Sequence, residues 1–389
     1  MGTFFRKAFA FCASYGFACV LFILLLILTY LGTLEQVDQG LYETQRKYFG
    51  SFIAVHDVFG VVPLPLPGAS LLLVLVFINL VCGGIVRARK GWRHIGVLIA
   101  HAGIAVLLIG SLVKFLFAVD GHMTLFEGQQ SNEFQSYYEW EIAISKCPGD
   151  GPPTEYIVPA AQFAAMDPGD TASFAHDDVP FNLVLSGYTR NCMPRAAGSA
   201  PGGHVVDGFY LEAAPFAKQA EQNIAGAYVT LEETASGTEH EGILWGVQRM
   251  PFAVTIDGML WTVDLRKRTW PLPFAIALDK FTHELHPRTN MPRAFMSEVT
   301  KIEGGSSQTV KISMNAPLRH RGYTFFQASW NPADPRTGRP VSSTFAVVRD
   351  PADQFPLYAC VVITIGLFLH FSLKLLWYLR AENRRARSS

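Results

Sequence analysis

The sequence contains no Cys-x-x-Cys pair, so it is neither a thioredoxin-like oxidoreductase nor a c-type cytochrome that carries its own haem. A P-loop, a Rossmann glycine fingerprint, a Ser-His-Asp order and paired catalytic carboxylates are also missing. Charged residues make up only 16% of the 389 residues, and 32 basic side chains balance 32 acidic ones. Without a basic excess there is no electrostatic footprint for nucleic acid. We therefore predict no catalytic residue and no nucleic-acid partner.

Long apolar runs are what the sequence does contain, and four of them predict transmembrane helices. Each is close to the ~20 residues that a helix needs to cross a ~30 Å hydrocarbon core. The first is longer than the apolar core of a signal peptide and is followed by no small-residue cleavage site, so we predict a retained anchor. The four runs are residues 8–31, 70–86, 95–117 and 355–378.

The runs divide the chain into three predicted parts. Residues 1–117 hold three membrane helices with an outer loop at 32–69, and residues 355–389 hold the fourth helix with a basic tail. Between them, residues 118–354 form one large soluble domain. We expect a multi-pass protein that is embedded in a lipid bilayer.

The distribution of basic residues predicts the orientation, because short basic loops stay in the cytoplasm. Basic residues gather before the first run, between the second and third runs, and after the fourth, and these three places fall on one side of a four-span chain. Both termini are therefore predicted to be cytoplasmic and the large domain extracytoplasmic. The residues are Arg6, Lys7, Arg87, Arg89, Lys90, Arg93, Arg380, Arg384, Arg385 and Arg387.

The large domain is predicted to be mostly β, as a sandwich or open barrel. The strongest local signal is the segment 252–265, where two alternating strands flank Asp257-Gly258, a pair that suits a hairpin turn. Gly304-Gly305 marks another turn, and one short helix is expected around 215–223. Other predicted strands are 139–145, 181–188, 227–231, 274–278, 297–302, 309–314, 324–328 and 343–348.

Several separated motifs carry a resemblance to a known family. They keep the same order, and the same placement relative to four membrane runs, as in ResB, a membrane component of the system II (Ccs) machinery of cytochrome c assembly. The resemblance extends over most of the chain except about 147–226. The motifs are Leu-Gly-Thr-Leu-Glu-Gln at 31–36, Phe-Ile-Asn-Leu-Val-Cys at 77–82, the segment 101–110 that begins with a histidine, the segment 272–281, Ser297, Asn-Ala-Pro at 315–317, the segment 322–329, and Arg-Asp-Pro at 349–351.

The resemblance implies a role in delivering haem or presenting apocytochrome c for covalent haem attachment. The implied place is the outer face of the bacterial inner (plasma) membrane, the implied cofactor is haem b, transiently bound or transported, and the implied partner is a ResC (CcsA)-type membrane protein. That partner carries a tryptophan-rich haem-handling segment. The seven tryptophans here do not cluster in such a segment, so the chain resembles the ResB half alone. We therefore expect a subunit of a synthase complex rather than an enzyme by itself.

His101 and His370 are the histidines that lie well inside the apolar runs. An ionisable ring in hydrocarbon is costly and usually faces a bundle interior or binds a ligand. Each is eight to ten residues from a basic boundary, Arg93 or Arg380, which places both in the inner half, roughly 12–15 Å from those charges. Neutral imidazole is a common axial ligand of haem iron. A hydrogen bond to another helix is the alternative for either residue.

For His101 the ResB resemblance implies an axial haem ligand, with the partner supplying the opposite one. His370 matches no motif; an internal His101–iron–His370 pair is geometrically permitted, and a packed or hydrogen-bonded side chain is preferred. Gly96, Gly103 and Gly110 recur every seven residues, roughly opposite His101 on a helical wheel, and predict close packing of helices within the chain. No metal other than haem iron is predicted.

Two of the six cysteines, Cys147 and Cys192, lie in the large domain, where a disulfide is chemically allowed. A structural bridge between them is expected, and two unpaired thiols are the alternative. The other four lie in the apolar runs, where they are most simply small apolar residues.

Two other functions stay open on the sequence. A haem-b or quinone-linked electron-transfer subunit would need two histidines on two spans for each haem, and only one such pair exists. A purely structural membrane anchor would use the β domain as a scaffold and would hold no haem. Cytochrome c assembly is favoured because both the membrane histidine and the motifs of the large domain point to it.

Overall fold

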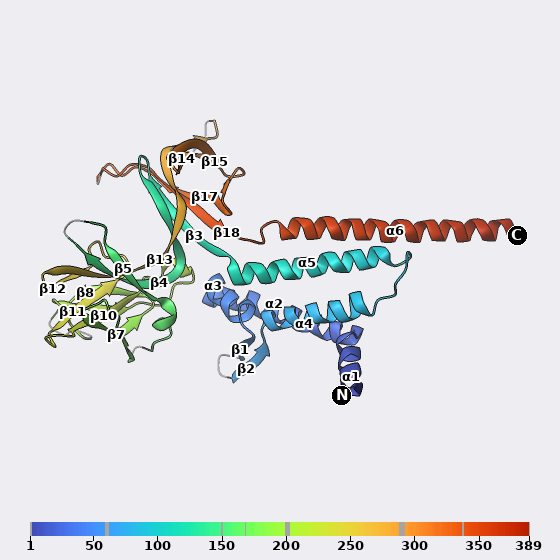
Figure 1. The fold of residues 1–389 in the computed structure, drawn as a ribbon, viewed down its shortest axis with the longest axis horizontal. Coiled ribbons are helices and arrows are strands. Elements are labelled where there is room, and N and C mark those ends of the chain that lie inside the picture. Colours follow the sequence, from blue (N-terminus) through green and yellow to red (C-terminus); the bar gives the residue numbers. More distant parts are fainter. Residues whose placement is uncertain are drawn as a thin grey trace. The chain divides into compact units, whose positions relative to one another are not determined.

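The computed structural model divides the chain into two compact units (Figure 1). One unit is Met1–Val119 with Arg349–Ser389 and is mainly helical, and the other is Asp120–Val348 and is mainly β. The predicted class, four apolar helices plus a large mostly-β domain, is confirmed. The structure describes residues 2–58, 62–148, 151–167, 169–198, 203–287, 292–336 and 338–388.

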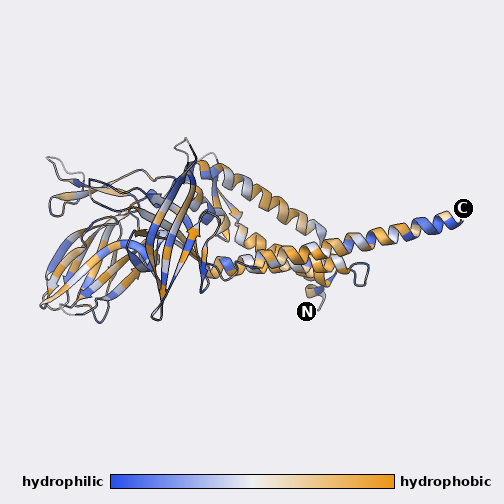
Figure 2. Cartoon of the chain, turned by 90° about the horizontal axis from the view of Figure 1, so that it is seen from above, coloured by the Kyte–Doolittle hydropathy of each residue, from blue (hydrophilic) through white to orange (hydrophobic). Residues whose placement is uncertain are grey.

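Four helices in the described residues are long and apolar enough to cross a membrane. Hydrophobic residues cover them along most of their length, whereas the C-terminal end of the last helix is hydrophilic (Figure 2). That last helix runs ten residues beyond its predicted end at 378, because the basic tail continues the helix. The four are α2 (Tyr15–Gln39), α4 (Ala69–Asn79) continued by η2 (Leu80–Val86), α5 (Ile95–Phe117) and α6 (Phe355–Ser388).

The first span does not begin at residue 8, as the apolar run suggested. Ser14 is extended, with φ −84° and ψ 145°, and its Oγ accepts a hydrogen bond of 3.2 Å from the Phe17 amide. This N-cap starts α2 and separates it from a shorter helix, α1 (Gly2–Cys12). Asn79 Nδ2 donates to the Cys12 and Ser14 carbonyls at 2.7 and 3.1 Å. Asn79 thereby joins the second span to the break: it is a donor to the Cys12 carbonyl and a second donor to the Ser14 carbonyl, which also accepts from the Ala18 amide.

The connection from α2 to α4 is ordered rather than a plain loop. It contains a short helix, α3 (Leu41–Thr44), a π-helical turn, η1 (Gln45–Phe49), and a two-stranded hairpin, β1 (Ile53–Val58) with β2 (Val62–Pro67). Tyr48 is fully buried where these pieces meet α2.

The glycine repeat of α5 faces α6. A Cβ added to Gly96 would lie 2.4 Å from the His370 amide nitrogen, and one added to Gly103 would lie 2.7 Å from Ile363 Cγ1. A Cβ on Gly110 would lie 2.5 Å from Cβ of Phe355. The helix backbones approach so closely that only hydrogen fits, which confirms the predicted packing within the chain.

The larger sheet of the β unit has ten strands and curls toward a barrel. Its order is β15-β14-β13-β4-β3-β18-β17-β16, with β12 paired to β13 and β5 paired to β4, and β15 at one end contacts β16 and β17 at the other. The strands are β3 (Val119–Phe126), β4 (Gln130–Cys147), β5 (Thr154–Pro159), β12 (Phe252–Ile256), β13 (Met259–Leu285), β14 (Pro292–Glu303), β15 (Ser306–Ser313), β16 (Leu318–His320), β17 (Tyr323–Asn331) and β18 (Ser342–Arg349).

A second sheet, of order β11-β10-β7-β6, packs on the part of the first that is formed by the later residues of β4 and the first residues of β13. One core joins them: Trp261 and Val263 of β13 share it with Leu183 of β7 and Val229 of β10, all nearly inaccessible. This part is therefore a sandwich. The remaining strands are β6 (Thr171–Phe174), β7 (Phe181–Thr189), β10 (Gly226–Glu233) and β11 (Glu239–Trp245), with β8 (Cys192–Ala196) and β9 (Phe209–Ala213) as a separate pair.

The predicted turns are confirmed. Ile256 pairs with Met259 around Asp257 and Gly258, whose φ values of 51° and 74° are those of the expected left-handed turn. Gly304 and Gly305, at φ 54° and 79°, likewise join β14 to β15. The helix expected around 215–223 is reduced to a three-residue 3₁₀ turn, η4 (Ala220–Gln222). There the Asn223 side chain bonds the backbone of Ala217 in both directions, which holds a loop instead.

A buried ion pair ties three strands of the larger sheet and supplies a test of its stability. Arg266 of β13 donates to Glu141 of β4 at 3.0 Å and to both oxygens of Glu155 of β5 at 2.7 and 3.0 Å. Glu141 is 5% exposed. Burial raises the pKa of the Glu141 carboxyl, and Arg266 opposes that shift.

Arg266→Met should therefore destabilise the protein by about 3–5 kcal/mol, because it leaves a buried carboxylate unpaired. The matched control is Arg268→Met, which removes an exposed pair with Glu139 and should cost under about 1 kcal/mol. Denaturant unfolding of the purified chain measures both. Equal effects of the two substitutions would contradict this account.

Candidate functional site

His101 lies on the face of α5 away from the glycine repeat and points toward η2. Its Nδ1 is 2.8 Å from the Gly84 carbonyl oxygen. Gly84 offers no side chain in the way: a Cβ there would lie 3.0 Å from His101 Nδ1. The absence of a side chain at Gly84 thus lets the imidazole ring reach the backbone of the neighbouring span.

The Gly84 carbonyl is available because the second span ends as a π-helix. The last carbonyls of a helix have no amide partner within it, and in an apolar environment each needs another donor. Arg87 N–H bonds the Cys82 carbonyl and the Lys90 ammonium bonds the Ile85 carbonyl. His101 Nδ1–H satisfies the Gly84 carbonyl. π-helical turns are frequent at functional sites, so this irregularity is a local signal in its own right.

A cavity of about 550 Å³ opens beside His101 within the helical unit. Its volume lies in the range of sites that hold small molecules and cofactors. Most of its wall is apolar, and its polar groups are few. The lining residues are Ala13, Ser14, Tyr15, Ala18, Phe22, Val76, Asn79, Leu80, Gly83, Gly84, Ala88, Arg89, His94, Val97, Leu98, His101 and Ile104.

The hydrogen bond assigns the His101 tautomer. A carbonyl oxygen only accepts, so Nδ1 carries the proton and Nε2 of the neutral ring carries the lone pair. Nε2 makes no hydrogen bond within the described part of the chain. An imidazole that donates through one nitrogen to a backbone carbonyl and keeps the other free has the arrangement of a metal-ligating histidine. The Nε2 lone pair of His101, the apolar wall of the cavity and the volume of the cavity therefore fit a haem.

His370 is not brought to His101. His370 lies on α6, against Gly96, and five residues separate Gly96 from His101, an angle of about 140° around α5. The structure therefore gives no support to an internal His101–iron–His370 pair: the His370 backbone packs on the Gly96 face of α5, whereas His101 reaches Gly84 from another face. His370 Nδ1 is buried, without a hydrogen-bond partner in the described residues.

The expected disulfide between Cys147 and Cys192 is also corrected, since both are free thiols. Cys147 ends β4, with its sulfur 4.0 Å from the Thr262 hydroxyl. Cys192 begins β8, buried against Gly226, and its carbonyl accepts from the Trp245 indole at 3.0 Å. The two sulfurs have different neighbours in different sheets, which the sequence alone could not reveal.

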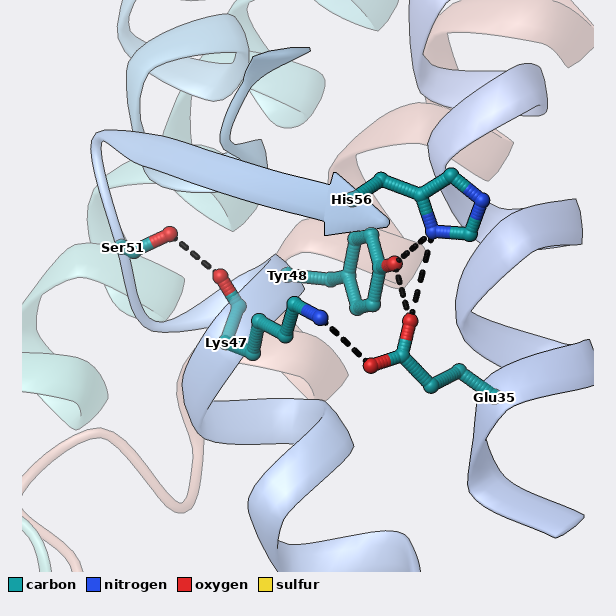
Figure 3. Close-up of polar contacts among 5 residues, drawn as sticks. All are labelled: Glu35, Lys47, Tyr48, Ser51 and His56. Atoms are coloured by element: carbon teal, nitrogen blue, oxygen red, sulfur yellow. Dashed lines mark hydrogen bonds and ion pairs between the residues drawn. The ribbon is translucent and has the colours of Figure 1, made fainter. Parts of the chain in front are cut away.

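A second group of polar side chains was not predicted. Glu35 at the end of α2, Lys47 and Tyr48 of η1, and His56 of β1 meet in one cluster, with Ser51 beside them (Figure 3). Lys47 Nζ is 2.5 Å from Glu35 Oε1. The Tyr48 hydroxyl bonds Glu35 Oε2 and lies 2.6 Å from His56 Nδ1. The sequence does contain one signal for this cluster: Glu35 is a glutamate within the 31–36 motif, close to an apolar run.

The cluster is shielded from solvent. Tyr48 is 0% exposed, and the Glu35 and His56 side chains are 16% and 22% exposed. Burial and the nearby Glu35 carboxylate raise the pKa of the Tyr48 phenol far above its usual range, so this group remains a hydrogen-bond donor.

Comparison with known proteins matches two segments of the chain to one family. Residues 72–153 and 252–342 match the model of the ResB-like family. Over 96 residues the chain is 38% identical to the cytochrome c biogenesis protein CcsB of Synechococcus sp. (strain CC9902), a stretch that covers 25% of this chain and 20% of that protein. The resemblance to ResB is confirmed by these matches.

The matched segments correspond to definite parts of the fold. The first contains α5 with His101, the π-helical turn with Gly84, and β4; the second contains β13 to β17. The residues between them, 154–251, supply the whole second sheet. His370, Cys192 and the Glu35 cluster lie outside the matched residues.

The finding that the cysteines are unpaired can be tested by thiol labelling. Denatured protein should take up the same amount of maleimide with and without prior reduction, because no thiol is held in a bridge. In the native protein Cys192 should react slowly at pH 8, since burial raises the pKa of its thiol to about 11. Peptide mass spectrometry after labelling reports each site. A Cys147–Cys192 cross-linked peptide would contradict the structure.

Proposed function

We propose that this chain is a cytochrome c assembly factor that holds haem in the membrane and works with a ResC/CcsA-type partner. The partner would complete covalent attachment to apocytochrome c on the outer face. The observation that carries the proposal is His101: its Nδ1–H is bonded to the Gly84 carbonyl at 2.8 Å, and its ring lines a cofactor-sized cavity. The matches to the ResB-like family and to a cytochrome c biogenesis protein support the same role.

In this proposal haem is cargo, and its iron supplies the coordination site that a neutral imidazole can occupy. His101 would hold the iron through Nε2, and the bond to Gly84 would keep the ring in one orientation. Apolar residues such as Phe22, Leu98 and Ile104 would exclude water. Arg89, which also lines the cavity, offers a cation for a carboxylate group of the cargo.

The proposed location is the bacterial inner (plasma) membrane, with both termini in the cytoplasm and the β unit outside. The support is the basic side chains between η2 and α5 and at the end of α6, because short basic segments stay in the cytoplasm.

The β unit would present the extended apocytochrome near the partner. Its sheets end in strands that have a neighbour on one side, such as β6 and β11 of the smaller sheet. Such edges can add a peptide strand by main-chain hydrogen bonds.

The first test compares two membrane histidines. His101→Ala should remove the haem that this site contributes to the complex purified with its partner, and added imidazole should restore part of it. His370→Ala is the matched control, since it removes a membrane imidazole from the other face of α5 and should leave the haem content unchanged. The pyridine haemochrome assay measures both. Equal haem contents in the two variants would return His101 to a structural role.

The second test addresses the function of the whole chain. Deleting the gene should remove haem-stained c-type cytochromes while b-type cytochromes persist, because haem synthesis is untouched. The wild-type gene should restore c-type cytochromes, and His101→Ala should restore them poorly. Normal c-type cytochromes in a deletion strain without a second gene copy would refute the assignment.

A further inference from the structure

The hydrogen bonds of the cluster at Glu35 assign its protons. The Glu35 carboxylate only accepts, so the Tyr48 hydroxyl must donate its single proton to Glu35 Oε2. The phenol oxygen is then an acceptor for His56 Nδ1, 2.6 Å away. Nδ1 is also 3.3 Å from Glu35 Oε2, a contact that is favourable only if Nδ1 is protonated. Of the two His56 nitrogens, Nδ1 therefore carries the proton in the neutral ring.

His56 Nε2 is left as a free lone pair. Its nitrogen lies on the side of the ring away from Glu35 and Tyr48 (Figure 3). It makes no hydrogen bond within the residues that the structure describes, and the side chain is 22% exposed. A carboxylate that attracts the Nδ1–H proton makes Nε2 a stronger metal ligand and holds the imidazole ring in place. His56 Nε2 is thus a potential ligand atom on a ring that its Nδ1 contacts hold in place.

The surroundings of His56 distinguish between possible ligands. A bare metal ion needs several protein ligands, and the described residues contain no group of three or more His, Cys, Asp or Glu side chains that could hold one. An iron porphyrin supplies four nitrogens of its own and needs only an axial ligand from the protein. Leu64, directly opposite His56 on β2, is 45% exposed, and Val62 is 58% exposed, so the ring has apolar neighbours. A flat apolar macrocycle fits this setting.

The geometry points to a second haem site, at which His56 Nε2 is the axial ligand and Glu35 and Tyr48 are positioning residues. Coordination would use the Nε2 lone pair in place of a water on the iron, with no change in protonation. This inference rests on the proposed function, since it assumes that haem is the cargo. The site is separate from the cavity at His101: Glu35 follows Phe22, a residue of that cavity, by thirteen positions, about 20 Å along α2.

The test titrates the purified full-length chain, in lipid nanodiscs, with iron(III) protoporphyrin IX. In a His101→Ala background one haem per chain should still bind, and adding His56→Ala should weaken that binding about 10–100-fold, with partial rescue by imidazole. His176→Ala, which removes a 53% exposed surface histidine, is the control for adventitious ligation and should change nothing. Metal-free protoporphyrin cannot be ligated, so its binding should be the same with and without His56.

The positioning residues have a spectroscopic test. Glu35→Gln and Tyr48→Phe should keep the haem but lower the iron–imidazole stretching frequency in the ferrous resonance Raman spectrum, because the ring becomes a weaker donor. A merely structural role of these residues would leave that frequency unchanged. Tm and circular dichroism show whether each variant is folded.

The outcomes separate this inference from the proposed function. Loss of all haem binding in folded His101→Ala, or unchanged binding in the His101→Ala, His56→Ala double variant, would overturn the second site. Binding that depends on His56 but not on His101 would support the second site and reject His101 as a ligand. If neither substitution affects haem, both assignments fail.

Discussion

An unpaired backbone carbonyl in hydrocarbon costs several kcal/mol, and this constraint explains the arrangement of the helical unit. The spans depart from regular α-helix at two places, the break at Ser14 and the π-helical end at Gly84, and each departure frees carbonyl groups. A polar side chain of another span reaches each one, Asn79 in the first case and His101 in the second. The bond that satisfies the fold at Gly84 is the same one that orients the proposed ligand.

The coarse fold could be predicted because its signals are local. Runs of apolar residues, strand alternation and glycine turns each act within a few residues, so the four spans and the hairpin at Asp257 were found. The break at Ser14 was missed because apolar residues continue on both sides of it, and the cap is a single hydroxyl. The helix expected around 215–223 failed for a related reason, since Asn223 holds the local backbone in a loop.

The candidate sites depend on contacts between distant residues, and these were only partly predictable. The glycine repeat correctly predicted the face of α5 that packs against another helix. That this helix is α6, and that His370 packs on a different face of α5 from His101, required the structure. The Glu35 cluster joins residues up to 21 positions apart through a buried tyrosine, with no periodic pattern to reveal it.

The length of β13 has a consequence for the way in which the β unit unfolds. Its first part forms the sandwich core with the second sheet, and its last part pairs with β14 in the near-barrel. Because β13 is one continuous strand of 27 residues, loss of its partners at one end should also weaken its pairing at the other end. The segment between the two matched regions is therefore not an independent module. We expect it to share a single cooperative transition with the rest of the β unit, without a stable half-folded form.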